Sequence, residues 1–90
     1  MKTLIIDGKR MKSKDSLYLH LKRVLALPNY FGNNLDALWD VLTEEDELTE
    51  IVFINTDQVK KHLGQYGVQL INLLEKLERQ NKNYRVLFYS

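Results

Sequence analysis

The sequence predicts an α/β fold, a three-stranded parallel sheet packed by about four helices in the order β-α-α-β-α-α-β. Three short apolar segments lie at residues 4–6, 51–54 and 84–89, and helical periodicity fills the long stretches between them. Strands joined by long helical crossovers run parallel, with right-handed connections. A chain of 90 residues has the size of one domain, so we expect a single domain over residues 1–90.

The first strand, at residues 4–6, is expected to end in a turn at Asp7 and Gly8. Ser13 can cap the helix that follows, because its hydroxyl can accept from a free amide of the first turn. One face of this helix is formed by Leu17, Leu21, Val24 and Leu25. Pro28 should end the helix.

A second helix should follow a loop at residues 28–33, with Asn34 as its N-cap. Its apolar face is predicted to contain Leu35, Leu38, Trp39 and Leu42. In the loop, we expect Phe31 to close the core.

The second half is expected to hold two strands and two helices. Because residues 51–54 are continuously apolar, we expect that strand to be buried on both faces. Thr56 can cap a short third helix, and Gly64 can close it. A fourth helix, broken by residues 81–83, is marked by Leu70, Ile71, Leu74 and Leu77.

Charge is segregated along the chain. The formal net charge is only +1, which lacks the strongly basic signature of a nucleic-acid-binding protein. Residues 1–27 carry +5, residues 28–58 carry eight acids and no base, and residues 59–90 carry +4. The acidic middle segment therefore favours a basic partner, and we expect no direct contact with nucleic acid.

The chain contains no cysteine, which favours a reducing compartment. Its start lacks the roughly 7–15 apolar residues of a signal peptide, and no run approaches the roughly 18 of a membrane span. We expect a cytoplasmic protein that does not associate with membranes.

Enzyme motifs are missing. The sequence offers no cysteine nucleophile, no glycine-rich phosphate loop and no metal-ligand spacing, and His20 and His62 each fall inside a predicted helix. We therefore expect no catalysis, no cofactor and no metal ion. A carboxylate pair at Asp36 and Asp40 could suggest glycoside hydrolysis or Mg²⁺ binding, but an outward-facing helix offers little cleft.

Asp36 and Asp40 should nevertheless lie on one outward side of the second helix, with Trp39 at the edge of its apolar face. A first-turn acid such as Asp36 is favoured by the helix dipole. Asp40 lies beyond the first turn, where a like charge four residues away destabilises a helix by a few tenths of a kcal/mol. Residues 28–58 contain no base that could compensate the pair locally, but bases distant in sequence could do so. A functional and a purely structural role for the pair therefore stay equally open.

The stretch from residue 27 to residue 40 reads LPNYFGNNLDALWD and resembles the signature of the barstar family, the intracellular inhibitors of the ribonuclease barnase. The resemblance extends over almost the whole chain. It implies a three-stranded parallel sheet packed by helices, and inhibition by plugging the nuclease active site. The implied partner is a barnase-like ribonuclease or another basic toxin, and the free chain is implied to be a monomeric immunity protein.

The resemblance also implies site residues. Asp40 would enter the phosphate pocket, Asp36 would pair with a neighbouring arginine, and Tyr30 would stack on the catalytic histidine. Backbone and packing contacts are implied for Gly32, Asn34, Leu35, Ala37 and Trp39.

Four features depart from the family. The family inhibitor is acidic overall, whereas this chain is +1. Asn33 replaces an acid, and Glu45 stands near the place of a second tryptophan. The acidic contact on the last helix has no clear match, because Lys76 or Leu77 occupies its place, although Glu75 or Glu78 could substitute. An interaction module for a non-nuclease partner therefore remains an alternative, and an enzyme is a third.

Overall fold

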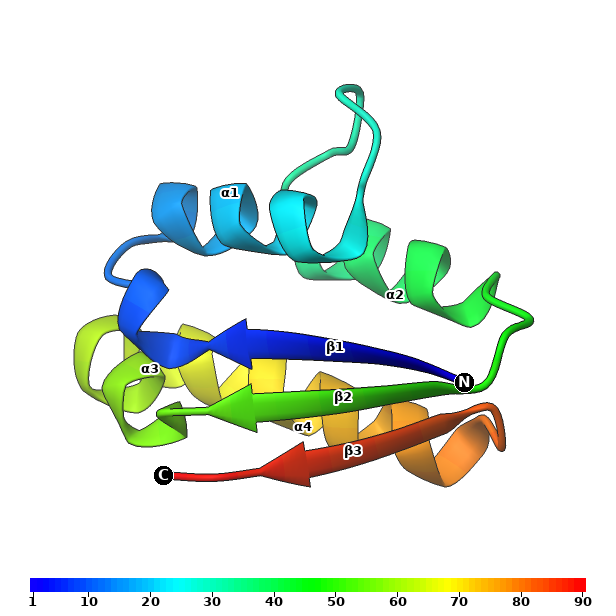
Figure 1. The fold of residues 1–90 in the computed structure, drawn as a ribbon. Helices are drawn as coiled ribbons and strands as arrows, with labels where there is room; N and C mark the ends of the chain where they lie inside the picture. The colour runs from blue at the N-terminus through cyan, green and yellow to red at the C-terminus, as the bar shows by residue number, and fades with distance from the viewer.

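The computed structural model describes residues 1–90 and confirms the predicted element order (Figure 1). The strands are β1 (Lys2–Asp7), β2 (Thr49–Ile54) and β3 (Tyr84–Phe88). The helices are the 3₁₀ turn η1 (Gly8–Arg10), α1 (Lys14–Leu25), α2 (Leu35–Thr43), α3 (Thr56–Leu63) and α4 (Gln65–Gln80). All strands are parallel in the order β1-β2-β3, with Leu4 beside Ile51 and Ile51 beside Val86.

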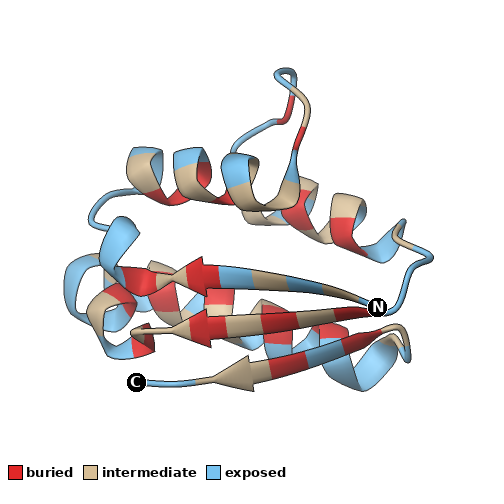
Figure 2. Cartoon of the chain, viewed as in Figure 1, coloured by how far each residue is buried: buried red, intermediate tan, exposed pale blue.

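The sheet is buried on one face only, so the expectation that residues 51–54 are buried on both faces was wrong. Ile51 and Phe53 are fully buried, whereas Val52 and Ile54 between them are half-buried (Figure 2). On the same open face, Ile5 of β1 is 57% exposed. One core cluster of 17 residues joins the other face of the sheet to the helices, which explains the alternating burial.

Two helix starts agree with the sequence. Ser13 and Ser16 form a reciprocal capping box at the start of α1, and Asn34 caps α2. The end of α1 differs, because the helix stops at Leu25 and Ala26 adopts a left-handed conformation with φ of 53°. A left-handed residue ends a helix by itself, so Pro28 is not the terminator.

Thr56 does not cap α3, contrary to the sequence-based prediction. It is the first helical residue and is buried, while Asn55 precedes it in a left-handed conformation with φ of 56°. The Asn55 amide instead donates to the Asp7 carboxylate at 2.9 Å and ties the ends of β1 and β2 together. The backbone there approaches so closely that a Cβ on Gly8 would lie 2.0 Å from the Asn55 carbonyl oxygen. Gly64 closes α3 as predicted.

His20 has a structural role at the carboxyl end of β1. Its Nε2 accepts a hydrogen bond from the Asp7 backbone N–H at 2.9 Å, which requires the neutral imidazole. Burial lowers the pKa of His20, and Arg10 and Arg23 lower it further against the opposing effect of Asp7.

We expect stability to fall on mild acidification because of His20. Since the pKa of His20 in the folded state lies below its ordinary value of 6.5, its contribution to stability is present above pH 6.5 and is lost as the pH falls below that value. Urea denaturation at pH 7.5 and pH 5.5 measures the loss. His20→Gln should reduce the difference in unfolding free energy between the two pH values. The control is His62→Gln, at an exposed position, which should leave that difference unchanged. The same difference in the wild type and both variants would contradict the role assigned to His20.

Candidate protein-binding surface

The loop between α1 and α2 projects from the body of the molecule and is anchored at two points (Figure 1). Leu27 and Phe31 are buried, and the Phe31 ring packs 6.0 Å from that of Tyr18, as predicted for core closure. Tyr30 lies between the anchors and is 90% exposed. The loop thus exposes the Tyr30 ring to solvent, while the buried side chains of Leu27 and Phe31 on either side of it hold the loop in place.

A single side chain joins this loop to the start of α2. The Asn34 Oδ1 accepts from the Ala37 N–H at 2.7 Å, while its Nδ2 donates to the Gly32 carbonyl at 3.0 Å. Asn33 provides the sharp change of direction with a left-handed φ of 51°. A Cβ on Gly32 would lie 3.2 Å from the Asn34 Nδ2, so glycine leaves room for this clamp. The clamp sets the position of the loop relative to the helix.

α2 separates apolar from acidic side chains as the sequence predicts. Leu38 and Leu42 are buried, and the half-buried residues beside them are Leu35, Ala37 and Trp39. Asp36 and Asp40 are exposed. The two ion pairs of the structure join Lys2 to Glu45 and Arg85 to Glu50, so neither aspartate carboxylate has a cation within 4 Å. Neither aspartate is therefore in an ion pair with a base from another part of the chain.

A groove runs between α2 and α4 beside the acidic face. Its volume is about 290 Å³, and its walls are Leu35, Asp36, Trp39, Gln69, Asn72, Leu73 and Lys76. The Lys76 Nζ lies 5.1 Å from the centroid of the Trp39 ring, a cation–π distance. Glu78 is engaged elsewhere, because its carboxylate accepts from the Val86 N–H at 2.7 Å. Glu75 does not line the groove either, so the charged side chain that α4 contributes to its wall is the Lys76 cation.

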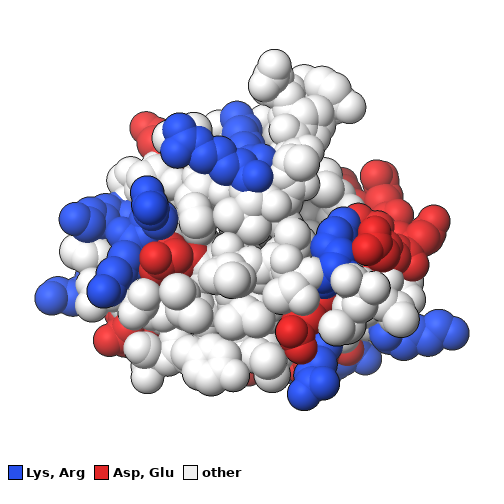
Figure 3. Space-filling view, in the orientation of Figure 1, with Lys and Arg blue, Asp and Glu red and all other residues white.

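The loop after α2 carries the acidic run Glu44–Glu47, which Figure 3 shows as part of a cluster of carboxylates beside the amino end of the sheet. Glu45 is paired with Lys2 at 2.6 Å, and this hydrogen bond is the main cause that lowers the pKa of Glu45. Glu44, Asp46 and Glu47 are exposed and are in neither ion pair. They extend the negative surface beyond α2.

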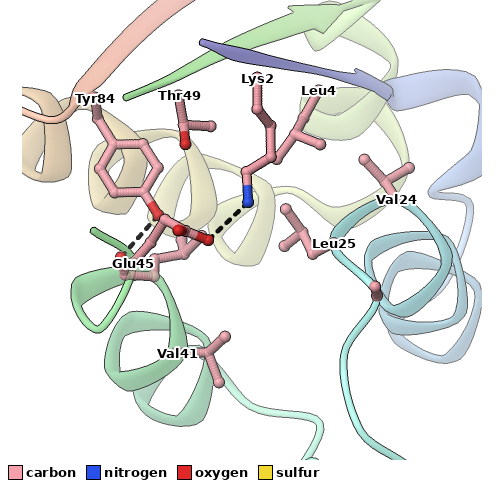
Figure 4. Close-up of a pocket in the computed structure, with 10 residues that line it drawn as sticks. Lys2, Leu4, Val24, Leu25, Val41, Glu45, Thr49 and Tyr84 are labelled. Carbon is pink, nitrogen blue, oxygen red and sulfur yellow. Dashed lines mark hydrogen bonds and ion pairs between the residues drawn. The ribbon is translucent and has the colours of Figure 1, made fainter. Parts of the chain in front are cut away.

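The end of α2 is braced against the sheet around a small cavity of about 140 Å³ (Figure 4). The Tyr84 hydroxyl donates to the Leu42 carbonyl at 2.7 Å, and the Lys2–Glu45 pair lies beside it. Burial, with a smaller contribution from Glu45, raises the pKa of Tyr84 to about 12. Both ends of α2 are therefore held by specific hydrogen bonds.

Comparison with known proteins decides the family. A family model described as "Barstar (barnase inhibitor)" matches residues 1–90. The chain belongs to the barstar family. It is also 33% identical over 84 residues to a Bacillus subtilis (strain 168) protein named "Putative ribonuclease inhibitor YrdF", with 92% of each chain covered.

Barstar membership places this chain in a family of inhibitors and does not by itself assign a role to each residue. The Asn34 side chain joins Gly32 of the loop to Ala37 in the first turn of α2. Tyr30 lies exposed on the projecting loop, and α2 carries the other residues predicted for the site. Sequence reasoning missed the contact between Lys76 and Trp39, since the two positions lie on different helices and share no motif.

None of the helices has both the length and the apolar character that a membrane span requires.

The Tyr84 brace can be tested by removing one oxygen. Tyr84→Phe removes the side-chain donor to the buried Leu42 carbonyl, which keeps a longer bond of 3.3 Å from the Glu45 N–H. We therefore expect the free energy of unfolding to fall by about 0.5–1.5 kcal/mol. Tyr89→Phe is the matched control, because Tyr89 is 55% exposed. Urea denaturation of both variants gives the comparison; equal stabilities would show that the bond contributes nothing.

Proposed function

We propose that this chain is a stoichiometric protein inhibitor of a barnase-like ribonuclease, which it blocks with α2 and the loop before it. The observation that carries the proposal is the pair of exposed, unpaired carboxylates at Asp36 and Asp40, on a helix held at both ends. Membership of the barstar family and the printed name of the relative support the same class of target.

The chemistry of such a target matches this surface. A ribonuclease active site binds a polyanion, so its cations are placed to receive phosphate oxygens. Carboxylates on a rigid helix can take the place of those phosphates and accept charge-assisted hydrogen bonds from arginine and histidine side chains. Because α2 and its loop are already ordered, little conformational entropy is lost on binding.

We assign individual roles on this basis. Asp40 enters the phosphate pocket, and Asp36 pairs with an arginine at its rim. Tyr30, already exposed on the projecting loop, stacks on the catalytic histidine. Contacts through backbone or packing come from Gly32, Asn34, Leu35, Ala37 and Trp39.

The cellular role follows from the chemistry of inhibition. The chain itself is not an enzyme in this proposal, and it acts in the cytoplasm as an immunity protein that protects the cell from a toxic nuclease. The lack of cysteine agrees with a reducing compartment. The exposed acids of the loop at residues 44–47 attract a basic enzyme at long range and so raise the rate of encounter.

The proposal predicts a large effect at Asp40. In an RNA-cleavage assay, wild-type chain should titrate a barnase-like ribonuclease one-to-one, and Asp40→Ala should weaken binding by at least ~2 kcal/mol, the hot-spot scale. Folding should be unaffected, because the Asp40 carboxylate has no ion-pair partner and removal of a like charge slightly favours the helix.

The matched control is Asp57→Ala, which removes the same charge from the same acidic segment but lies on α3. It should inhibit nearly as well as wild type. Equal inhibition by Asp40→Ala and wild type, at equal stability, would refute the assignment of α2 as the binding element.

A further inference from the structure

Lys76 is the cation that borders the acidic face of α2. Residues 28–58 contain no base, so a positive charge on this surface has to come from another element, and α4 supplies it. The Lys76 ammonium lies over the Trp39 ring and has no carboxylate within 4 Å, although Asp36 lines the same groove. The groove therefore carries unpaired charges of both signs.

A partner that covers Asp36 and Trp39 also covers Lys76. Removing an unpaired ammonium from water is unfavourable, and the Trp39 ring offsets only a part of that loss. The partner must at the same time bring cations to Asp36 and Asp40, and those cations repel Lys76. An anion that the partner places in the groove offsets both penalties, because it attracts Lys76 and screens it from those cations.

We propose that Lys76 determines which ribonuclease this chain inhibits, because the α2–α4 groove accepts an acidic side chain of the enzyme. The enzyme's carboxylate pairs with the Lys76 ammonium, and the side-chain amides of Gln69 and Asn72 on the same wall can donate to it. A ribonuclease with only cations at this position is rejected by like-charge repulsion. This inference rests on the proposed function.

Charge reversal tests the inference. The probe is a ribonuclease purified from the parent cell on immobilised wild-type chain and identified by its cleavage of RNA. We expect Lys76→Glu to raise the Kd for this enzyme by about tenfold or more and Lys76→Gln to raise it less, since reversal adds repulsion to the lost pair. Lys60→Glu is the matched control, with the same change of charge at an exposed position on α3.

The outcomes separate the two claims. If Lys76→Glu binds as tightly as Lys60→Glu, or more tightly than wild type, the inference is wrong even where Asp40→Ala still abolishes inhibition. If the column retains no ribonuclease that the wild type inhibits, the proposed function and the inference fall together. Unfolding in urea, followed by the fluorescence of Trp39, the one tryptophan of the chain, shows that the variants are folded.

Discussion

Burial of the apolar side of α2 is the constraint on which the rest of the candidate surface depends. Leu38 and Leu42 are almost completely buried, so the helix cannot rotate without exposing them. The Asn34 clamp at one end and the Tyr84 hydroxyl at the other prevent it from sliding. With the helix fixed in this way, Asp36 and Asp40 have to point outward.

That arrangement is electrostatically unfavourable in the free chain. Two like charges lie four residues apart on one helix, and neither is in one of the two ion pairs of the structure. Lys76 approaches from α4 but packs on Trp39 instead of pairing with either aspartate. The free protein gains only the favourable interaction of Asp36 with the helix dipole, whereas a protein that binds a cationic site gains two unpaired, preorganised acceptors.

Sequence patterns within a few residues predicted the helix caps well, but they did not predict features that depend on contacts between distant parts of the chain. Ser13 and Asn34 could be identified as caps because the capping bond is made within one helical turn. Burial of residues 51–54 was overestimated, because an apolar run does not reveal that the core lies on only one face of the sheet. The N-cap position of α3 is occupied by Asn55 and not by the predicted Thr56. The Asn55 side-chain amide bonds to Asp7, which is far away in sequence, so local signals could not reveal it. For the same reason the resemblance could only place Lys76 or Leu77 at the family's contact position on the last helix, and did not reveal that Lys76 packs on Trp39 beside Asp36.

The central claim is that this chain and an RNA phosphate compete for one site on the enzyme. The most direct test measures the affinity of the wild-type chain for its ribonuclease while a nucleotide that occupies the enzyme's active site is added at constant ionic strength. If α2 fills that site, the apparent Kd rises in proportion to the nucleotide concentration once the enzyme is saturated with nucleotide. An apparent Kd that does not change would show that the chain binds elsewhere on the enzyme and would contradict the account.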